Sequence, residues 1–215
     1  MDRIKKLCAY LSPCDTFADV GCDHGYCTQY MLKNMLCKKA IISDISEKCL
    51  SKAQQLLKDY VEESKCIPVC CSGLKNIDSS VDLVLIAGMG GEEIIAILED
   101  AYIPKNFVLQ PMKNVREVRE YLQKCGAEIT RDDVFESGGK YYFVLCGKKY
   151  GNKNMYTPAE LEFGRGDKNG ALGGFLREEL LKKREYLTRN LSYASRLQIL
   201  ERINYIEEIL AGEIK

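Results

Sequence analysis

The residues best suited to chemistry lie in one short segment, Asp19-Val20-Gly21-Cys22-Asp23-His24-Gly25-Tyr26. Glycine at position 21 lets the backbone turn tightly after an apolar stretch and approach a ligand. A helix that follows such a turn directs its free N–H groups at that ligand. Asp44 ends the next apolar stretch, where a carboxylate can accept both ribose hydroxyls of a nucleoside. Together these features predict a nucleoside cofactor. Taken alone, the glycine loop could be a turn without a ligand, and Asp44 could be the N-terminal cap of the following helix.

The composition of this segment favours S-adenosylmethionine over a dinucleotide. Pyrophosphate recognition needs glycine at three set positions, and the third is Cys27 here. Asp23 would also repel a pyrophosphate. S-adenosylmethionine carries a sulfonium and an ammonium group and no phosphate, so acidic residues such as Asp19 and Asp23 attract it.

Two further motifs follow later apolar stretches. Ala87-Gly88-Met89-Gly90-Gly91 would let a flat group approach the backbone closely, and Leu109-Gln110-Pro111-Met112 carries an amide that can hydrogen-bond a base edge. The alternatives are a flexible connection for the first and an amide bonded to the backbone for Gln110. Because ligands bind at the carboxyl ends of parallel strands, both motifs are expected at the rim of the same site.

These motifs must be positioned by alternating strands and helices. The hydrophobic pattern predicts strands over 16–20, 40–44, 67–71, 81–86 and 107–109, and helices over 24–36, 92–99 and 115–124. Ser46 is expected to cap a helix that continues well past 54–57. Two strands over 127–135 and 141–148 read as a hairpin. The pattern predicts an α/β fold with a Rossmann-like class I methyltransferase sheet, parallel with a C-terminal antiparallel hairpin.

The last third of the chain has a different character. A Gly- and Asn-rich loop precedes two amphipathic helices. Their apolar stripes are Leu176, Leu180, Leu187 and Leu191 in the first and Ile199, Ile203, Ile206 and Leu210 in the second. Such stripes predict an antiparallel, coiled-coil-like helical pair. We therefore expect a cofactor-binding catalytic domain over 1–150 and a small helical domain over 151–215.

Composition narrows the class of protein. The 215 residues are 46% hydrophobic, with 31 basic and 31 acidic residues, enough apolar surface for a packed core. No stretch approaches the ~18 apolar residues of a membrane span. Eleven cysteines without a CxxC pair, and one histidine, argue against a zinc site. An odd number of cysteines without an export signal favours reduced thiols. We expect a cytoplasmic monomer without a metal or membrane partner.

In combination, these motifs resemble those of the bacterial tRNA (adenine22-N1)-methyltransferase family over essentially the whole chain. The resemblance rests on the segment from Asp19 to Tyr26, on Asp44, on the motifs 87–91 and 109–112, and on Gly139-Lys140-Tyr141-Tyr142. It implies methyl transfer from S-adenosylmethionine to N1 of an adenine in the tRNA D-loop. One departure concerns the cofactor: the family usually has Gly-Asp-Gly-Leu where this chain has Cys71-Ser72-Gly73-Leu74.

Site roles follow from the motifs and the resemblance. The expected cofactor-binding residues are Asp19, Gly21, Cys22, Asp44, Ile45, Ser72, Gly73, Ala87, Gly88 and Met89. The expected catalytic residues are Asp23, to stabilise positive charge on the base, His24, to orient or accept a proton, and Tyr26, to stack. The alternatives are that Asp23 only binds the cofactor and that His24 only caps a helix or packs. Gly90, Gln110, Pro111 and Met112 are expected to face the substrate.

Transfer RNA requires contacts with phosphates, so the basic residues matter. Residues 177–202 hold seven basic and four acidic residues, a local charge of +3 within a neutral chain. Lys182, Lys183 and Arg184 are the expected tRNA contacts. Further basic clusters are Arg3, Lys5 and Lys6, and Lys113, Arg116 and Arg119. The alternative for each cluster is a solvated helix face. Three other functions compete with this interpretation. The first is another S-adenosylmethionine-dependent methyltransferase, acting on RNA or a small molecule. The others are a nicotinamide-dependent enzyme and a non-catalytic tRNA-binding protein.

Overall fold

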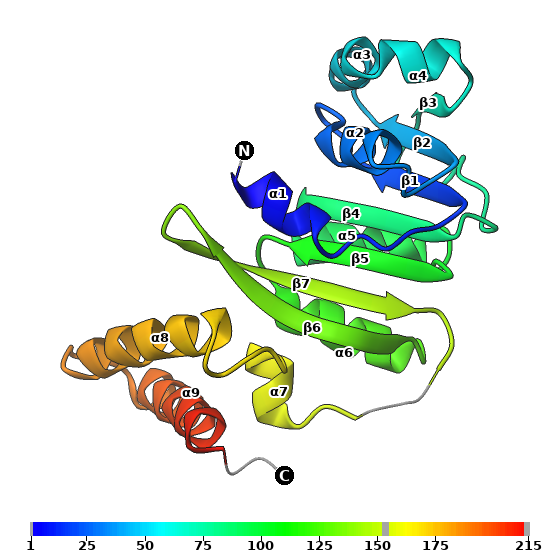
Figure 1. Cartoon of the computed structure of the whole chain (residues 1–215). Coiled ribbons are helices and arrows are strands. Elements are labelled where there is room, and N and C mark those ends of the chain that lie inside the picture. The colour runs from blue at the N-terminus through cyan, green and yellow to red at the C-terminus, as the bar shows by residue number, and fades with distance from the viewer. Residues whose placement is uncertain (1, 152–154, 213–215) are drawn as a thin grey trace.

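A computed structural model describes residues 2–151 and 155–212, whose strands form one seven-stranded sheet in the order β3-β2-β1-β4-β5-β7-β6 (Figure 1). The strands are β1 Thr16–Val20, β2 Lys39–Asp44, β3 Cys66–Cys70, β4 Leu83–Met89, β5 Asn106–Pro111, β6 Glu128–Ser137 and β7 Lys140–Lys148. Strands β1 to β5 pair in parallel, whereas β7 runs antiparallel to both β5 and β6. The predicted class I methyltransferase fold is therefore confirmed.

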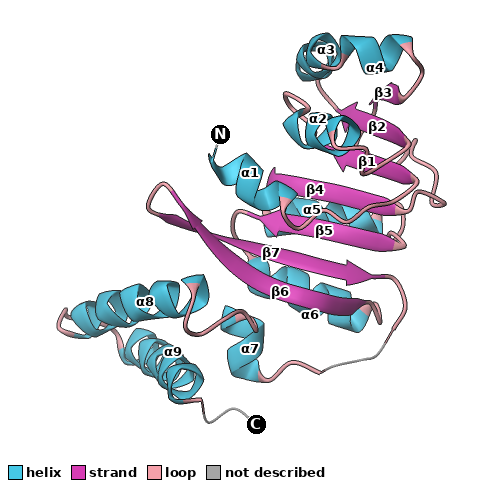
Figure 2. Cartoon of the chain, viewed as in Figure 1, coloured by secondary structure: helices cyan, strands magenta, loops and turns pink. Residues whose placement is uncertain are grey.

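Helices cover both faces of this sheet (Figure 2). They are α1 Asp2–Cys8, α2 Tyr26–Lys33, α3 Glu47–Leu56, α4 Lys58–Glu62, α5 Gly91–Glu99 and α6 Val115–Lys124. Leu83 and Leu85 of β4 pack with α1, α2 and α3, whereas Val84 and Ile86 pack with α5 and α6. Successive side chains of a strand point to opposite faces, so a strand covered on both faces is apolar throughout.

Some helix boundaries differ from the predicted ones. The helix predicted from residue 24 begins at Tyr26, and α1 and α4 were not predicted. Ser46 caps α3 as expected, accepting a hydrogen bond from the Cys49 N–H at 3.3 Å. The prediction that 54–57 lies well inside one helix is wrong, because α3 ends at Leu56. Leu57 leaves the helical conformation, and its side chain is fully buried in the core.

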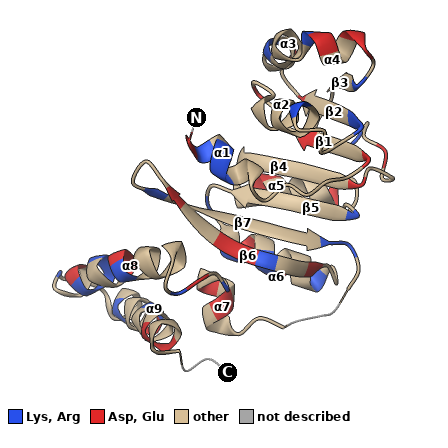
Figure 3. Cartoon of the chain, in the orientation of Figure 1, with Lys and Arg blue, Asp and Glu red and all other residues tan. Residues whose placement is uncertain are grey.

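Three more helices follow the sheet: α7 Pro158–Phe163, α8 Ala171–Leu187 and α9 Tyr193–Ala211. Helix α8 packs against the outer strand β6, α7 packs against α6, and α9 packs against α7 and α8. Leu176, Ile203 and Ile206 are buried as predicted, whereas Leu191 lies beyond the end of α8. Basic and acidic residues are spread along both α8 and α9 (Figure 3). No helix among the described residues is long and apolar enough to cross a membrane. The domain boundary at residue 150 stays a prediction.

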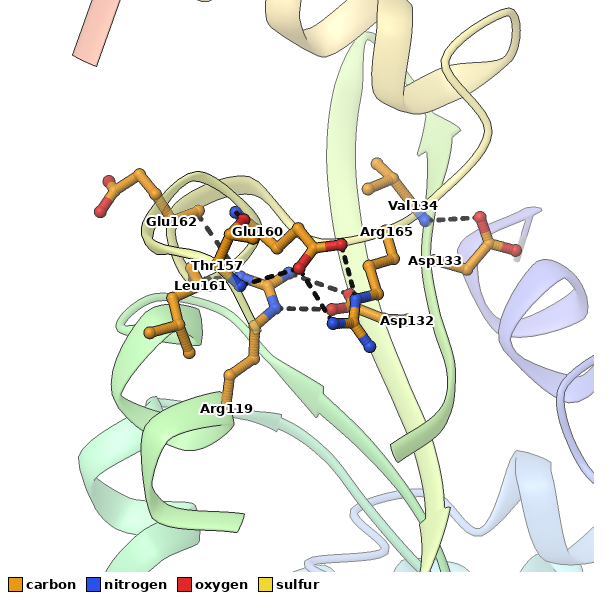
Figure 4. A network of polar contacts seen from close by, with 9 residues as sticks. All are labelled: Arg119, Asp132, Asp133, Val134, Thr157, Glu160, Leu161, Glu162 and Arg165. Atoms are coloured by element: carbon orange, nitrogen blue, oxygen red, sulfur yellow. Dashed lines mark hydrogen bonds and ion pairs between the residues drawn. The ribbon is translucent and has the colours of Figure 1, made fainter. Parts of the chain in front are cut away.

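A buried arginine joins α6, β6 and α7. The Arg119 guanidinium donates to both carboxylate oxygens of Asp132, at 2.7 and 3.0 Å, and to the Leu161 carbonyl at 3.0 Å (Figure 4). Both charged side chains are almost completely excluded from solvent. The prediction that Arg119 belongs to a tRNA-binding cluster is therefore wrong, because its side chain holds α7 against the sheet.

Candidate functional site

The loop between β1 and α2 is fixed by its backbone. The N–H groups of Gly21 and Cys22 both donate to the Ser43 carbonyl, at 2.8 and 3.0 Å, which ties the loop to the end of β2. Gly21 and Gly25 have φ near +70°, a conformation that favours glycine. A Cβ on Gly21 would meet the Met89 methyl group at 2.0 Å. The loop is thus shaped for close approach, as its sequence predicts.

A cavity of about 490 Å³ opens at the carboxyl ends of β1, β2, β3 and β4. Its lining includes nine of the predicted residues: Gly21, Asp23, Asp44, Ile45, Ser72, Gly73, Ala87, Gly88 and Met89. Sequence motifs separated by up to about seventy positions therefore converge on one space.

Asp44 has a free acceptor in this cavity. One carboxylate oxygen accepts from the Ser46 N–H at 2.8 Å, and no described residue bonds the other. The helix-cap alternative for Asp44 fails, because the Ser46 side chain is the cap of α3. Ile45 beside it is strongly exposed, which leaves an apolar side chain open to a flat ring. The pair suits a nucleoside whose ribose hydroxyls bond Asp44.

The end of β4 gives the ligand room. The pairing of β4 with β5 shifts register between Ala87 and Met89, which leaves Gly88 in a bulge with φ +81°. Apart from Gly88 itself and its two neighbours in the chain, no described residue has a heavy atom within 4 Å of the position that a Gly88 Cβ would take. Gly90 precedes α5, and the Lys113 side chain packs over it. A bulge at this place lets a ligand lie directly on the backbone.

A second cavity of about 250 Å³ lies beneath α1 and shares Arg3, Gly21, Asp23 and Ala87 with the first. Asp19 and Cys22 line it and are buried. Burial raises the pKa of Asp19 to about 7, even though the Thr28 hydroxyl donates to its carboxylate at 2.9 Å. No described cation pairs with Asp19. A positively charged ligand group would therefore stabilise its ionised form.

The three expected catalytic residues lie together beside this cavity. The Asp23 carboxylate is 3.8 Å from His24 Nε2, and Asp23 has φ +45°. The imidazole of His24 stacks on Tyr26 with 5.6 Å between ring centroids. Asp23 and Tyr26 are exposed, so this group faces the entrance and not the core.

The motif 109–112 at the end of β5 was expected to face the substrate, but its side chains are placed differently. Gln110 is only 1% exposed, and its amide donates to the Pro111 carbonyl at 3.2 Å and to Met112 Sδ at 3.4 Å. Its buried Oε1 has no partner among the described residues. Pro111 is buried, whereas Met112 is half-exposed. The backbone-bonded alternative thus describes the Gln110 amide donor, while its oxygen stays free.

Arg3 is the site residue that the motifs missed, since the sequence placed it only in a basic cluster. It lines both cavities, and its guanidinium lies 3.7 Å from Met112 Sδ. The signal available was its position on α1, four residues before the buried Leu7. Only the folded chain shows which strand ends the Arg3 side chain overhangs. Glu93 and Lys75 also line the larger cavity.

The expected tRNA contacts on α8 are separate from both cavities and engaged with acids. Lys182 lies 3.2 Å from Glu179, and Lys183 lies 3.6 Å from the same carboxylate. Arg184 pairs with Glu207 of α9 at 2.8 Å. Lys182 and Arg184 are exposed, whereas the Lys183 side chain is mostly covered. Ion pairs at exposed positions contribute little to stability, so the role of these residues as tRNA contacts stays a prediction.

Known proteins place this geometry in a family. Residues 1–145 match the family model described as "Methyltransferase domain". A protein of Mycoplasma pneumoniae named "Putative tRNA methyltransferase" is 33% identical over 145 residues, covering 67% of this chain and 68% of its own. The tRNA (adenine(22)-N(1))-methyltransferase of Bacillus subtilis is 28% identical over 182 residues, covering 82% and 74%.

A solved structure shares the fold over nearly the whole chain. The structure of M. capricolum TrmK in complex with S-adenosyl-homocysteine has a TM-score of 0.88 and 22% identity, with 98% of this chain and 97% of that one covered. The sequence match and the shared fold agree with the resemblance based on the motifs. The chain therefore belongs to the methyltransferase-domain family, in the group that includes the tRNA (adenine(22)-N(1))-methyltransferases.

Proposed function

We propose that this protein transfers a methyl group from S-adenosylmethionine to N1 of adenine 22 in the tRNA D-loop. The observation that carries the proposal is the pair of joined cavities at the carboxyl ends of the strands, with a free Asp44 oxygen in one and the buried Asp19 in the other. The family relationship supplies the tRNA and the adenine position.

The residues present fit the cofactor. Asp44 offers an acceptor for ribose hydroxyls, and Ile45 and the backbone near Ser72 and Gly73 offer a surface for the adenine ring. The carboxylates of Asp19 and Asp23 suit its ammonium and sulfonium groups. When bound, S-adenosylmethionine supplies an electrophilic methyl group.

The chain itself has little covalent chemistry to do. N1 of adenine has an in-plane lone pair and can attack the methyl group in line, so positioning is the main contribution of the protein. Adenine must leave its stack to reach the cavity. Tyr26 lines the cavity under α1, Met112 lies beside Arg3, and both are partly exposed, so an aromatic ring and a thioether are available to hold the flipped base. Asp23 is placed to stabilise the positive charge that develops on it, and His24 to orient Asp23.

The experiment is nucleoside mapping of unmodified tRNA after incubation with labelled S-adenosylmethionine. We expect 1-methyladenosine at position 22 and none in a tRNA whose adenine 22 is replaced. The Asp23→Ala protein should stay folded and lose at least 100-fold in methylation rate. Label in a small molecule, or binding of tRNA without methylation, would contradict the proposal.

A further inference from the structure

The side-chain amide of Gln110 has an oxygen that no described residue satisfies. Gln110 is only 1% exposed, and its Oε1 is buried without a hydrogen-bond partner. A buried acceptor without a partner destabilises a protein, and native structures contain few of them. At the edge of a ligand site, such an atom indicates a contact that the ligand makes.

The nitrogen of this amide fixes which way the amide points. Nε2 donates to the Pro111 carbonyl at 3.2 Å, and because a carbonyl only accepts, the amide oxygen cannot take the place of the nitrogen. Nε2 also donates to Met112 Sδ at 3.4 Å, and a thioether is a weak acceptor. Gln110 therefore offers a ligand one free acceptor and, beside it, one donor that is held only weakly.

Gln110 lies next to the cavities and on the same side of the sheet as α1. In the pairing of β4 with β5, it is opposite Ala87, which lines both cavities. Val108 packs in the core that includes α1, whereas Leu109 packs with α5 and α6. Because side chains alternate along a strand, Gln110 turns toward α1. A base that enters beside the proposed cofactor site would lie against this amide.

Met112 covers the amide and is able to move. Its sulfur contacts Gln110 Nε2 and lies 3.7 Å from Arg3 Nη1, whereas its backbone N–H is fixed by the Met89 carbonyl at 2.8 Å. The Met112 side chain is 49% exposed, and a methionine side chain has three rotatable bonds. An incoming base can therefore displace the thioether while the backbone of the loop stays in place.

We propose that Gln110 selects adenine by binding its Hoogsteen edge, with Oε1 accepting from the N6 amine and Nε2 donating to N7. The inference rests on the proposed function, because it assumes that an adenine is the substrate. A glutamine amide pairs with N6 and N7 of adenine in this bidentate way. The Hoogsteen edge leaves N1 free, so its lone pair stays available for the methyl group. Guanine would be rejected, because its O6 carbonyl would face the Gln110 oxygen.

The test uses three full-length tRNAs that carry adenine, purine or 7-deazaadenine at position 22. Purine lacks the N6 amine, and 7-deazaadenine lacks N7 but keeps N6 and N1. Single-turnover methylation rates are measured with wild type and with Gln110→Met, whose side chain has a similar length and no amide. We expect each altered base to slow wild type about 5- to 50-fold relative to adenine, because one buried polar atom of Gln110 loses its partner. In Gln110→Met both penalties should be at least fivefold smaller.

Gln123→Met is the matched control. Gln123 also donates to a methionine sulfur, Met155 Sδ at 2.9 Å, but it lies near the end of α6 and lines neither cavity. This variant should keep the wild-type rates on all three tRNAs within twofold. Gln110→Asn, whose amide is too short to reach the same atoms, is the second variant if Gln110→Met does not fold, and it should show the same reduced penalties.

The pattern across the three tRNAs separates base selection from a structural role. A Gln110 variant that is slower on all three tRNAs by the same factor would overturn the inference, because the amide would then only support the loop. Equal wild-type rates on adenine, purine and 7-deazaadenine would also overturn it. Failure of the wild type to methylate the tRNA that carries adenine would instead contradict the proposed function.

Discussion

Asp19 should make the ligand-free protein less stable as the pH rises. Its carboxyl is buried beneath α1, and the Thr28 hydroxyl at 2.9 Å is its one side-chain donor. Burial raises its pKa from 3.8 to about 7. The folded state therefore keeps a proton on Asp19 between about pH 4 and pH 7, whereas the unfolded chain releases it. The resulting stability is present below pH 4 and is lost as the pH rises to about 7.

The size of the effect follows from the two pKa values. Each tenfold change in protonation equilibrium corresponds to about 1.4 kcal/mol, so the difference between 3.8 and about 7 corresponds to about 4 kcal/mol. Asp19→Asn keeps the shape of the side chain and an acceptor for Thr28 but cannot ionise. The variant should be more stable than wild type above pH 7 by a few kcal/mol, and this advantage should vanish near pH 4.

Urea unfolding of both proteins at several pH values between 4 and 8.5 measures the effect. The informative quantity is the difference in the free energy of unfolding between wild type and Asp19→Asn, because other groups titrate in both proteins. Calorimetry with S-adenosylhomocysteine should give the opposite ranking, with at least tenfold weaker binding by Asp19→Asn, since the ammonium group loses its anion. The wild-type affinity should rise with pH up to about 7. A stability difference that is the same at every pH would refute the reasoning.

Three other changes test the site and its support. Ser72→Asp places a carboxylate at the wall of the larger cavity and should strengthen S-adenosylhomocysteine binding about fivefold in calorimetry. The reason is that an ionised acceptor bonds the adenine amine more strongly than a hydroxyl does. Weaker binding would show that Ser72 does not face the adenine. A triple variant should weaken tRNA binding tenfold or more in filter binding at low salt and leave S-adenosylhomocysteine binding unchanged; it changes Lys182, Lys183 and Arg184 together to Glu. A tRNA affinity equal to that of wild type would exclude α8 as a contact. Arg119→Met should lower the free energy of unfolding by about 3–5 kcal/mol in urea, because the buried Asp132 loses the one ion pair that it makes within the described part of the chain. A loss below about 1 kcal/mol would contradict the role given to this pair.

The sheet and most of the lining of the cavity proposed for the cofactor could be predicted because both depend on local patterns. Apolar stretches that end in Gly21, Asp44 and Gly88 predict parallel strands and also mark their carboxyl ends, where ligands bind. The family resemblance adds the substrate. The reversed hairpin was also visible, since two strand patterns flank a turn rich in glycine.

The rest depends on contacts between distant positions. Arg3 and Met112 are 109 positions apart, and no periodicity in α1 shows which strand ends it will cover. Arg119 occurs in a run of charged residues and reads as a surface cation, yet Asp132 and the Leu161 carbonyl enclose it. Gln110 likewise looks like a free rim amide until packing buries it.

In this chain, buried charged side chains differ in whether they have a charged partner, and this difference distinguishes residues that stabilise the fold from residues that line a ligand cavity. Arg119 and Asp132 are buried together, and each satisfies the other, so their charges stabilise one packing of α6, β6 and α7. Asp19 is as deeply buried but has a hydroxyl in place of a cation, and Arg3 has a sulfur and a ring in place of an anion. Unpaired charges of opposite sign line one cavity of about 250 Å³. A positively charged ligand group would satisfy Asp19, so this unpaired carboxylate marks a ligand cavity, whereas the paired Arg119 and Asp132 stabilise the fold.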